Sequence, residues 1–163
     1  MKHFPGHGNS RSDSHAGIAD VSKYWDKSEL VPYKILLGEG VIDAIMTAHI
    51  INRKLDESGL PATLSEKIIT GILRQEMGYQ GVIISDDMQM HAISKYYGFA
   101  ESIAMCINAG VDILMFSNNI KGANRYSPSN IHETIKGLVR SGKIKESRIN
   151  ESYARIMAMK VTR

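Results

Sequence analysis

Three short runs of mainly apolar residues alternate along this chain with stretches that carry helical signals, and this alternation limits the folds open to it. The runs are residues 44–48, 81–85 and 111–116. Strands separated by helices form right-handed β-α-β units around a parallel sheet. The strands of such a sheet are apolar throughout, because helices cover both of its faces. The sequence therefore predicts an α/β fold with a parallel sheet.

Helical signals fill the segments between and after these runs. Thr63 and Glu66 have the spacing of a capping box, and apolar residues recur at helical period behind them. A second helix is expected over residues 99–109, because Gly110 follows as a C-terminal cap. A third is expected over residues 128–141, since it opens with a proline. A last helix is predicted from one apolar face, formed by Ile149, Tyr153, Ile156 and Met157.

The segment from residue 9 to residue 40 has no regular pattern. It is polar and rich in Ser, Asp and Gly, which are residues typical of loops. We expect a long loop here, followed by a helical turn from Pro32 to Leu37.

Polar residues gather where the apolar runs stop. They are His3 and His7 near the N-terminus, His49 after the first run, Asp86 and Asp87 after the second, and Ser117 to Asn119 after the third. In parallel α/β folds the chemistry takes place at the C-terminal ends of the strands. Polar groups at four strand ends favour a (β/α) barrel over an open sheet. A Rossmann fold has no support, because there is no glycine-rich dinucleotide fingerprint.

Composition narrows the classes of function. The 163 residues are 43% hydrophobic and carry a net charge of +3, with the basic residues scattered, so nucleic-acid binding has little support. No apolar run approaches the roughly 18 residues that span a bilayer, and no signal peptide is visible. The single cysteine, Cys106, lies in an apolar helical stretch and is expected to be buried and unreactive. We expect a cytoplasmic protein without membrane or nucleic-acid partners.

Two short motifs supply ionisable side chains suited to hydrolysis. The chain opens with Lys2-His3-Phe4-Pro5-Gly6-His7-Gly8, and Asp13-Ser14-His15 follows a short polar stretch. The second apolar run passes directly into two carboxylates, Asp86 and Asp87. A strand end holds a carboxylate rigidly, as a nucleophile requires. Taken alone, an Asp-x-His sequence in a polar loop is more often a surface pair.

These motifs carry a resemblance to a known family. Residues 2–8, with Asp13 and His15 behind them, resemble the signature of bacterial β-N-acetylglucosaminidases (β-hexosaminidases) of glycoside hydrolase family three. Later segments are similar to successive strands and helices of the same domain; they are residues 44–50, 61–65, 72–74, 81–87 and 109–112. The resemblance covers nearly the whole chain and is loosest over residues 16–43.

The resemblance implies a retaining glycosidase that forms a covalent glycosyl-enzyme and needs no cofactor or metal. It places the nucleophile at Asp86 and the general acid/base at His15, with Asp13 orienting and tuning that imidazole. Lys2 and His3 correspond to the pair that binds the sugar. A neighbouring carboxylate stabilises a protonated imidazole, so His15 can protonate the leaving oxygen and later deprotonate water.

The substrate implied is a glycoside with a terminal non-reducing β-N-acetylglucosamine, with peptidoglycan (muropeptide) recycling in the cell wall as the expected context. A chitin oligosaccharide or a glycan is equally compatible with the sequence. Phosphate remains an alternative acceptor to water.

Four further residues stay open between structural and functional roles. His7 is expected to order the loop rather than to touch the substrate. His49 is either a packed histidine or part of the floor of the site. Asp87 is expected to cap the following helix, and Asp112 to be a structural hydrogen-bond partner.

The length of the chain conflicts with a complete barrel. A (β/α)₈ barrel takes about 250 residues and seldom fewer than about 200, whereas the family signature begins here at residue 2 of 163. Residues 1–163 are therefore expected to form the C-terminal half of a TIM-type catalytic barrel domain, with the first half missing. That half also supplies an arginine and an aspartate to the family's sugar site. The open barrel edges predict self-association and little activity of this chain alone.

Two alternatives come from other classes. One is an inactive or partner-dependent half-barrel. The other is a metal-dependent barrel hydrolase, whose ligands would come from His3, His7, Asp13, His15, His49 and Asp86.

Overall fold

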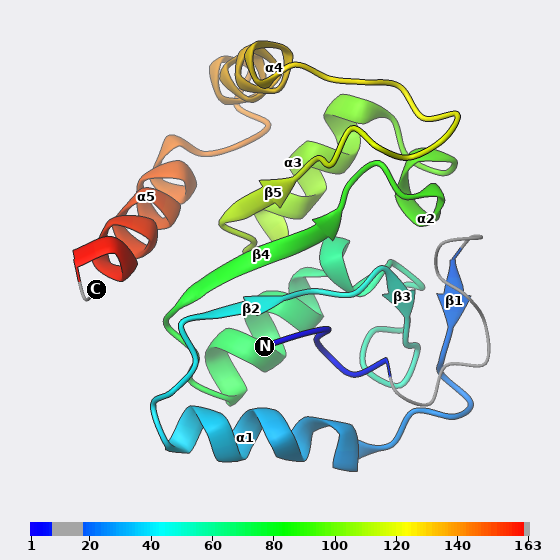
Figure 1. Cartoon of the computed structure of the whole chain (residues 1–163), viewed down its shortest axis with the longest axis vertical. Helices are drawn as coiled ribbons and strands as arrows, with labels where there is room; N and C mark the ends of the chain where they lie inside the picture. The colour runs from blue at the N-terminus through cyan, green and yellow to red at the C-terminus, as the bar shows by residue number, and fades with distance from the viewer. Residues whose placement is uncertain (8–17, 162–163) are drawn as a thin grey trace.

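A parallel three-stranded sheet runs through the middle of the molecule (Figure 1). The computed structural model describes residues 1–7 and 18–161. Strands β2 (Ala44–Met46), β4 (Val82–Asp87) and β5 (Ile113–Met115) pair in that order and are all parallel. Each apolar run of the sequence supplies one strand, so the predicted parallel α/β fold is confirmed.

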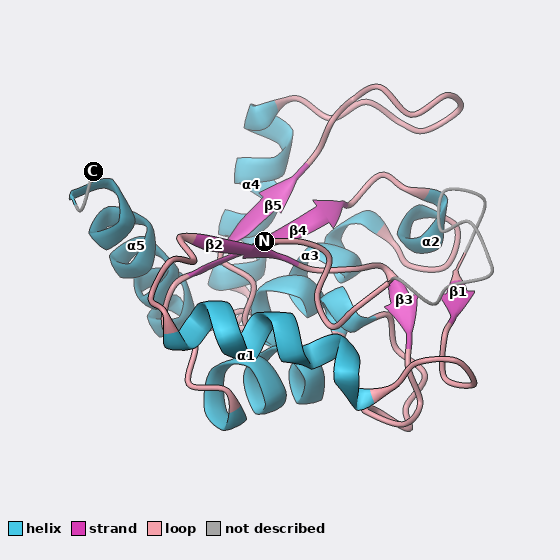
Figure 2. Ribbon diagram, turned by 60° about the horizontal axis from the view of Figure 1, so that its bottom comes forward, coloured by secondary structure: helices cyan, strands magenta, loops and turns pink. Residues whose placement is uncertain are grey.

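The N-terminal residues lie beside β2 and extend this sheet (Figure 2). The Phe4 N–H donates to the Met46 carbonyl at 2.8 Å, and the Ala48 N–H donates to the Phe4 carbonyl at 2.8 Å. Phe4 and Thr47 also form a parallel bridge. This pairing brings His3 to the end of the sheet at which β2 and β4 finish.

Helices connect the strands and cover the sheet, as expected for β-α-β units. The helical elements are η1 (Lys27–Leu30), α1 (Val31–Gly38), η2 (Ala62–Leu64), η3 (Lys67–Glu76), α2 (His91–Ser94), α3 (Phe99–Ala109), α4 (Pro128–Arg140) and α5 (Glu146–Val161). The prediction for residues 99–109 is confirmed at both ends, since Gly110 closes α3 in the left-handed conformation. No helix among the described residues is both long enough and apolar enough to cross a membrane.

The segment predicted as a long loop contains more structure than its sequence suggested. Among its described residues, β1 (Ala19–Asp20) pairs in parallel with β3 (Ile50–Ile51), and η1 follows. Helix α1 confirms the helical turn predicted from Pro32 to Leu37. The Trp25 indole donates to the Pro5 carbonyl at 3.0 Å and so ties this segment to the N-terminal motif. A strand of two residues leaves no periodicity, which is why the pattern missed it.

The helix predicted from a capping box begins differently. Ser65, rather than Thr63, caps the helix, because its hydroxyl accepts from the Ile68 N–H at 3.1 Å. Thr63 belongs to η2 and bonds instead to residues that follow β2. Spacing cannot decide between two hydroxyl residues that stand so close together.

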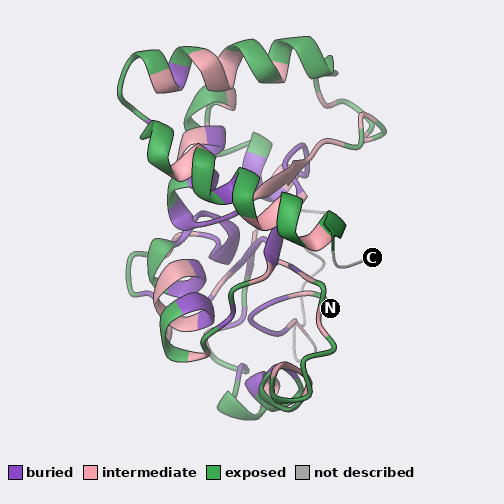
Figure 3. Cartoon of the chain, turned by 90° about the vertical axis from the view of Figure 1, so that its left-hand side faces the viewer, coloured by how far each residue is buried: buried purple, intermediate pink, exposed green. Residues whose placement is uncertain are grey.

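The core lies between the sheet and the helices around it. Its largest fully buried apolar side chains are Phe4, Ile45, Ile50, Ile68, Ile69, Leu73, Ile83, Ile93, Ile103 and Ile144. Cys106 is buried as predicted, and burial raises the pKa of its thiol. Helices α4 and α5 remain largely exposed on their outer sides (Figure 3).

The prediction of an apolar face on helix α5 holds at Ile149, which packs against a core cluster, and is wrong at Tyr153 and Met157. Tyr153 is 64% exposed and Met157 is 38% exposed. The face turned inward carries Arg148, Ser152 and Arg155. These side chains lie near the N-terminal end of β5.

Asp112 is the acceptor on which that polar face converges. Its carboxylate is fully buried and lies just before β5. It accepts from Arg74 at 2.6 Å, Ser152 at 2.7 Å, Arg148 at 3.0 Å, the Ile83 N–H at 3.0 Å and Arg155 at 3.2 Å. The expected structural role of Asp112 is confirmed.

Candidate active site

Asp86 and His3 meet at the C-terminal ends of the strands, although they come from opposite parts of the sequence. Nε2 of His3 lies 3.9 Å from Oδ2 of Asp86. Oδ1 of Asp86 accepts a hydrogen bond of 2.9 Å from the Asp87 N–H. The Asp86 side chain is 18% exposed and that of His3 33%, so both are accessible to a small molecule. The structure thus brings together the predicted nucleophile and one predicted sugar-binding residue.

The loop that carries His3 is held by contacts on several sides. The Phe4 and Tyr33 rings pack edge to face at 5.1 Å. Gly6 has a φ of 115°, and a Cβ at this position would lie only 2.7 Å from Cβ of Glu29. The backbone therefore requires glycine at residue 6. The His3 and His7 rings are 6.3 Å apart, which places His7 in the same loop beside His3.

His49 lies buried close to Asp86 and is only 1% exposed. Its Nε2 is 3.0 Å from the Asp87 carbonyl, and its Nδ1 is 2.8 Å from the Thr63 hydroxyl. The Thr63 hydroxyl is in turn 2.7 Å from that of Thr47. Burial lowers the pKa of the His49 imidazole, while the nearby Asp86 carboxylate acts in the opposite direction.

Asp87 turns inward and has a structural role. Ser117 Oγ donates to Oδ2 of Asp87. Oδ1 accepts from the Gln89 N–H at 3.0 Å and from the Ser117 N–H at 3.3 Å. Asp87 therefore stabilises the turn after β4 and joins it to the end of β5. The prediction that it caps the following helix is wrong, because Met90 stands at the N-cap of α2 and no side chain among the described residues caps that helix.

Gln89 fixes the loop after β5 and was missed by the sequence analysis. It is 2% exposed, its Oε1 accepts from the Asn118 N–H at 2.6 Å, and its Nε2 donates to the Asn124 carbonyl at 2.5 Å. Asn118 has a φ of 55°, a conformation that Asn tolerates better than most residues. The polar run at residues 117–119 was the only sequence signal of this network.

The remaining predicted site residues fall into two groups. Lys2 is exposed and adjoins His3 in the N-terminal segment. Asp13 and His15, the predicted acid/base pair, lie outside the described residues, so their roles stay predictions.

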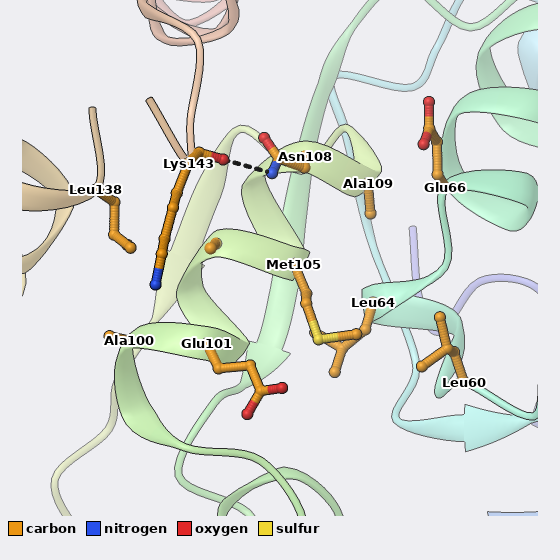
Figure 4. Close-up of a pocket in the computed structure, with 11 residues that line it drawn as sticks. Leu60, Leu64, Glu66, Ala100, Glu101, Met105, Asn108, Ala109, Leu138 and Lys143 are labelled. Carbon is orange, nitrogen blue, oxygen red and sulfur yellow. Dashed lines mark hydrogen bonds between the residues drawn. The ribbon is translucent and has the colours of Figure 1, made fainter. Parts of the chain in front are cut away.

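The groove in Figure 4 lies away from this site, among η2, α3 and α4. Its volume is about 570 Å³, and its lining includes Leu64, Met105 and Leu138. The side chain of Asn108 donates to the Lys143 carbonyl at 3.0 Å on its wall. It contains none of the residues predicted to act on a sugar.

Within residues 1–7 and 18–161, no group of three or more His, Cys, Asp and Glu side chains is arranged to hold a metal ion.

The family is decided by comparison with known proteins. Residues 1–159 match the model of the glycosyl hydrolase family 3 N-terminal domain. The chain belongs to this family. The predicted resemblance, and with it the TIM-barrel type of fold, is confirmed.

Individual relatives agree with the family match. A β-hexosaminidase of Tolumonas auensis is 40% identical over 125 residues, which cover 75% of this chain and 37% of that protein. A solved family 3 β-N-acetylglucosaminidase from a Paenibacillus species matches this chain with a TM-score of 0.86 and 38% identity. The match covers 98% of this chain and 30% of that protein. CbsA of Thermotoga neapolitana, solved with zinc bound, has a TM-score of 0.85 and 31% identity over 96% of this chain and 34% of its own. The family 3 chain thus spans about a third of the length of these relatives.

Proposed function

We propose that this family 3 chain contributes to a glycoside hydrolase that removes terminal non-reducing β-N-acetylglucosamine. The observation that carries the proposal is the Asp86 carboxylate, presented at the end of β4 with His3 across from it. Relatives named β-hexosaminidase and β-N-acetylglucosaminidase support the choice of sugar.

The proposed reaction proceeds in two displacements with Asp86 as nucleophile. A carboxylate oxygen of Asp86 forms a bond to the anomeric carbon as the glycosidic C–O bond breaks. His15 gives its proton to the departing oxygen, and Asp13 stabilises the imidazolium beforehand. Water then attacks the same carbon, His15 takes its proton, and Asp86 leaves as a carboxylate. Two inversions give net retention.

His3 and Lys2 are proposed to bind the sugar. An imidazole and an ammonium donate hydrogen bonds to ring hydroxyls. His3 is well placed for this role because the same imidazole faces Oδ2 of Asp86. Peptidoglycan fragments in the cytoplasm are the substrates that we propose, with water as the acceptor.

The test is the stereochemistry of the first product. The hydrolase to which this chain contributes should release the β-anomer of the free sugar from an aryl β-N-acetylglucosaminide, and NMR should detect that anomer before it equilibrates. Asp86→Ala should abolish the reaction, because it removes the proposed nucleophile and with it the glycosyl-enzyme. Glu57→Ala, at an exposed carboxylate outside the proposed site, is the matched control and should keep full activity. Release of the α-anomer, or turnover by Asp86→Ala within tenfold of the unmodified protein, would contradict the proposal.

A metal-dependent hydrolase is the second candidate, and the zinc bound to CbsA is the observation that favours testing it. Metal analysis of the purified protein, with assays before and after dialysis against a chelator, separates the two. If the glycosidase mechanism is correct, dialysis against the chelator should leave the activity unchanged.

A further inference from the structure

The backbone of Asp87 joins a buried histidine to the nucleophile. Its carbonyl oxygen is 3.0 Å from Nε2 of His49, and its N–H donates to Oδ1 of Asp86 at 2.9 Å. Its side chain is held separately by Ser117 and by the Gln89 N–H. The orientation of this one residue therefore depends on His49 and in turn sets the position of the Asp86 carboxylate.

Hydrogen-bond chemistry fixes where the His49 proton lies. A carbonyl oxygen can only accept, so Nε2 carries the hydrogen that it donates to Asp87. Burial lowers the pKa of His49 and favours its neutral ring, and His3 acts in the same direction. Asp86 and Asp87 act in the opposite direction and favour the cation. In the neutral ring Nδ1 is an acceptor.

Thr63 supplies the donor for that nitrogen. Its hydroxyl lies 2.8 Å from Nδ1 of His49 and 3.0 Å from the Ala48 carbonyl. The Ala48 carbonyl also accepts from the Thr63 N–H at 3.2 Å, so it keeps a partner when the hydroxyl turns to the imidazole. The Thr47 hydroxyl then donates to Thr63 Oγ1 at 2.7 Å. Every polar atom of this buried group has a partner in the arrangement that holds His49 as its Nε2–H tautomer.

We propose that His49 is a positioning residue for the nucleophile. Through the backbone carbonyl and N–H of Asp87 it holds Oδ1 of Asp86, which leaves Oδ2, the oxygen facing His3, to attack the anomeric carbon. The inference rests on the proposed function and adds to it the choice of attacking oxygen and the residue that enforces that choice. Misplacing a reacting atom by about 1 Å can cost on the order of 100-fold in rate, so loss of this hold is expected to lower kcat.

Two substitutions of similar size separate positioning from packing. The side-chain amide nitrogen of Gln reaches about as far as Nε2 of histidine, whereas that of Asn reaches only as far as Nδ1. His49→Gln can therefore still donate to the Asp87 carbonyl, and His49→Asn cannot. His132, whose side chain is 71% exposed, provides the control pair His132→Gln and His132→Asn.

The first readout is kinetic, on an aryl β-N-acetylglucosaminide. His49→Asn should lower kcat on the order of 100-fold with KM changed less than about threefold, and His49→Gln should recover at least about tenfold of that loss. Thermal unfolding of both variants checks that the difference in kcat is not caused by a difference in their stability. Equal kcat values for the two variants, or a loss confined to KM, would overturn the proposal.

The second readout does not depend on catalysis. The Asp87 amide should exchange with solvent at least about tenfold faster in His49→Asn than in the unmodified chain or in His49→Gln, because its bond to Asp86 is no longer held. Nitrogen chemical shifts of the His49 ring should report the Nε2–H tautomer. Absence of glycosidase activity from the unmodified hydrolase to which this chain contributes would refute the proposed function alone, while unchanged Asp87 exchange in His49→Asn would refute the positioning role.

Discussion

Oδ2 of Asp86 and Nε2 of His3 lie 3.9 Å apart, which is too far for a direct hydrogen bond and close enough for both to touch one sugar. The carboxylate comes from β4, and the imidazole from the segment beside β2. Pairing of the N-terminal residues with the sheet therefore assembles the site.

Removal of the His3 imidazole should weaken recognition of the sugar. His3→Ala is expected to reduce kcat/KM by about 10- to 100-fold, the loss of one hydrogen bond to substrate, with the fold intact. Steady-state kinetics on an aryl β-N-acetylglucosaminide measure the effect. His132→Ala, at an exposed position, is the control and should behave as the unmodified protein.

His15→Ala should impair the second displacement most, because a good aryl leaving group needs little help from an acid. Azide needs no general base, so adding it should partly restore turnover and yield a glycosyl azide. Asp13→Ala should show a milder defect of the same kind, since Asp13 acts only through the imidazole. A pH–rate profile that neither substitution alters would remove both residues from the mechanism.

The free energy of unfolding should decrease as the pH is lowered, because the buried His49 resists protonation. Its pKa in the folded chain is lowered from an ordinary value of 6.5, so the unfolded chain takes up the proton first as the pH falls. The stabilisation is complete above pH 6.5 and is lost progressively below it, with a slope of at most about 1.4 kcal/mol per pH unit for one proton.

Urea denaturation at several values between pH 8 and pH 5, at one protein concentration, tests this prediction. The unmodified chain should lose more stability over that range than His49→Gln, which has no ring to protonate. Parallel pH profiles for the two proteins would show that His49 is not responsible.

Asp112→Asn should destabilise the fold strongly. The substitution leaves Arg74, Arg148 and Arg155 around a neutral group, and breaking such a buried pair costs about 3–5 kcal/mol. Glu133→Gln, the same chemical change in an exposed pair with Lys136, should have no measurable effect. Equal midpoints of urea denaturation for the two variants would contradict this interpretation of Asp112.

The isolated chain of 163 residues is expected to self-associate. In the described sheet β5 is an edge strand, and its three residues are only partly buried. Such an edge offers backbone N–H and C=O groups to another chain. Light scattering across a dilution series checks this, and a monodisperse monomer of 18.1 kDa at every concentration would disprove it.

Features were predictable from the sequence where the residues that determine them lie within the same short segment. Helix α3 was found correctly because Phe99 and Gly110 mark its ends within the segment itself. The partners of Asp112 could not be found, since Arg74 and Arg155 meet it only after the helices pack. The apolar stripe on α5 misled for the same reason: Tyr153 follows helical period yet faces solvent. At the candidate site, the motifs singled out Asp86 and His3, which the structure brings together. Gln89 has no motif and bonds to backbone groups of the loop after β5.

The ion cluster at Asp112 and the Asp86 carboxylate occupy opposite ends of the same pair of strands, β4 and β5. In barrel folds the end where the strands begin governs stability, and the end where they finish governs chemistry. Protein engineering can therefore treat the two ends separately. Joint replacement of the Asp112 cluster by well-packed apolar side chains is a route to a more heat-resistant protein with unchanged specificity, because buried ion pairs are often no more stabilising than apolar residues of equal volume.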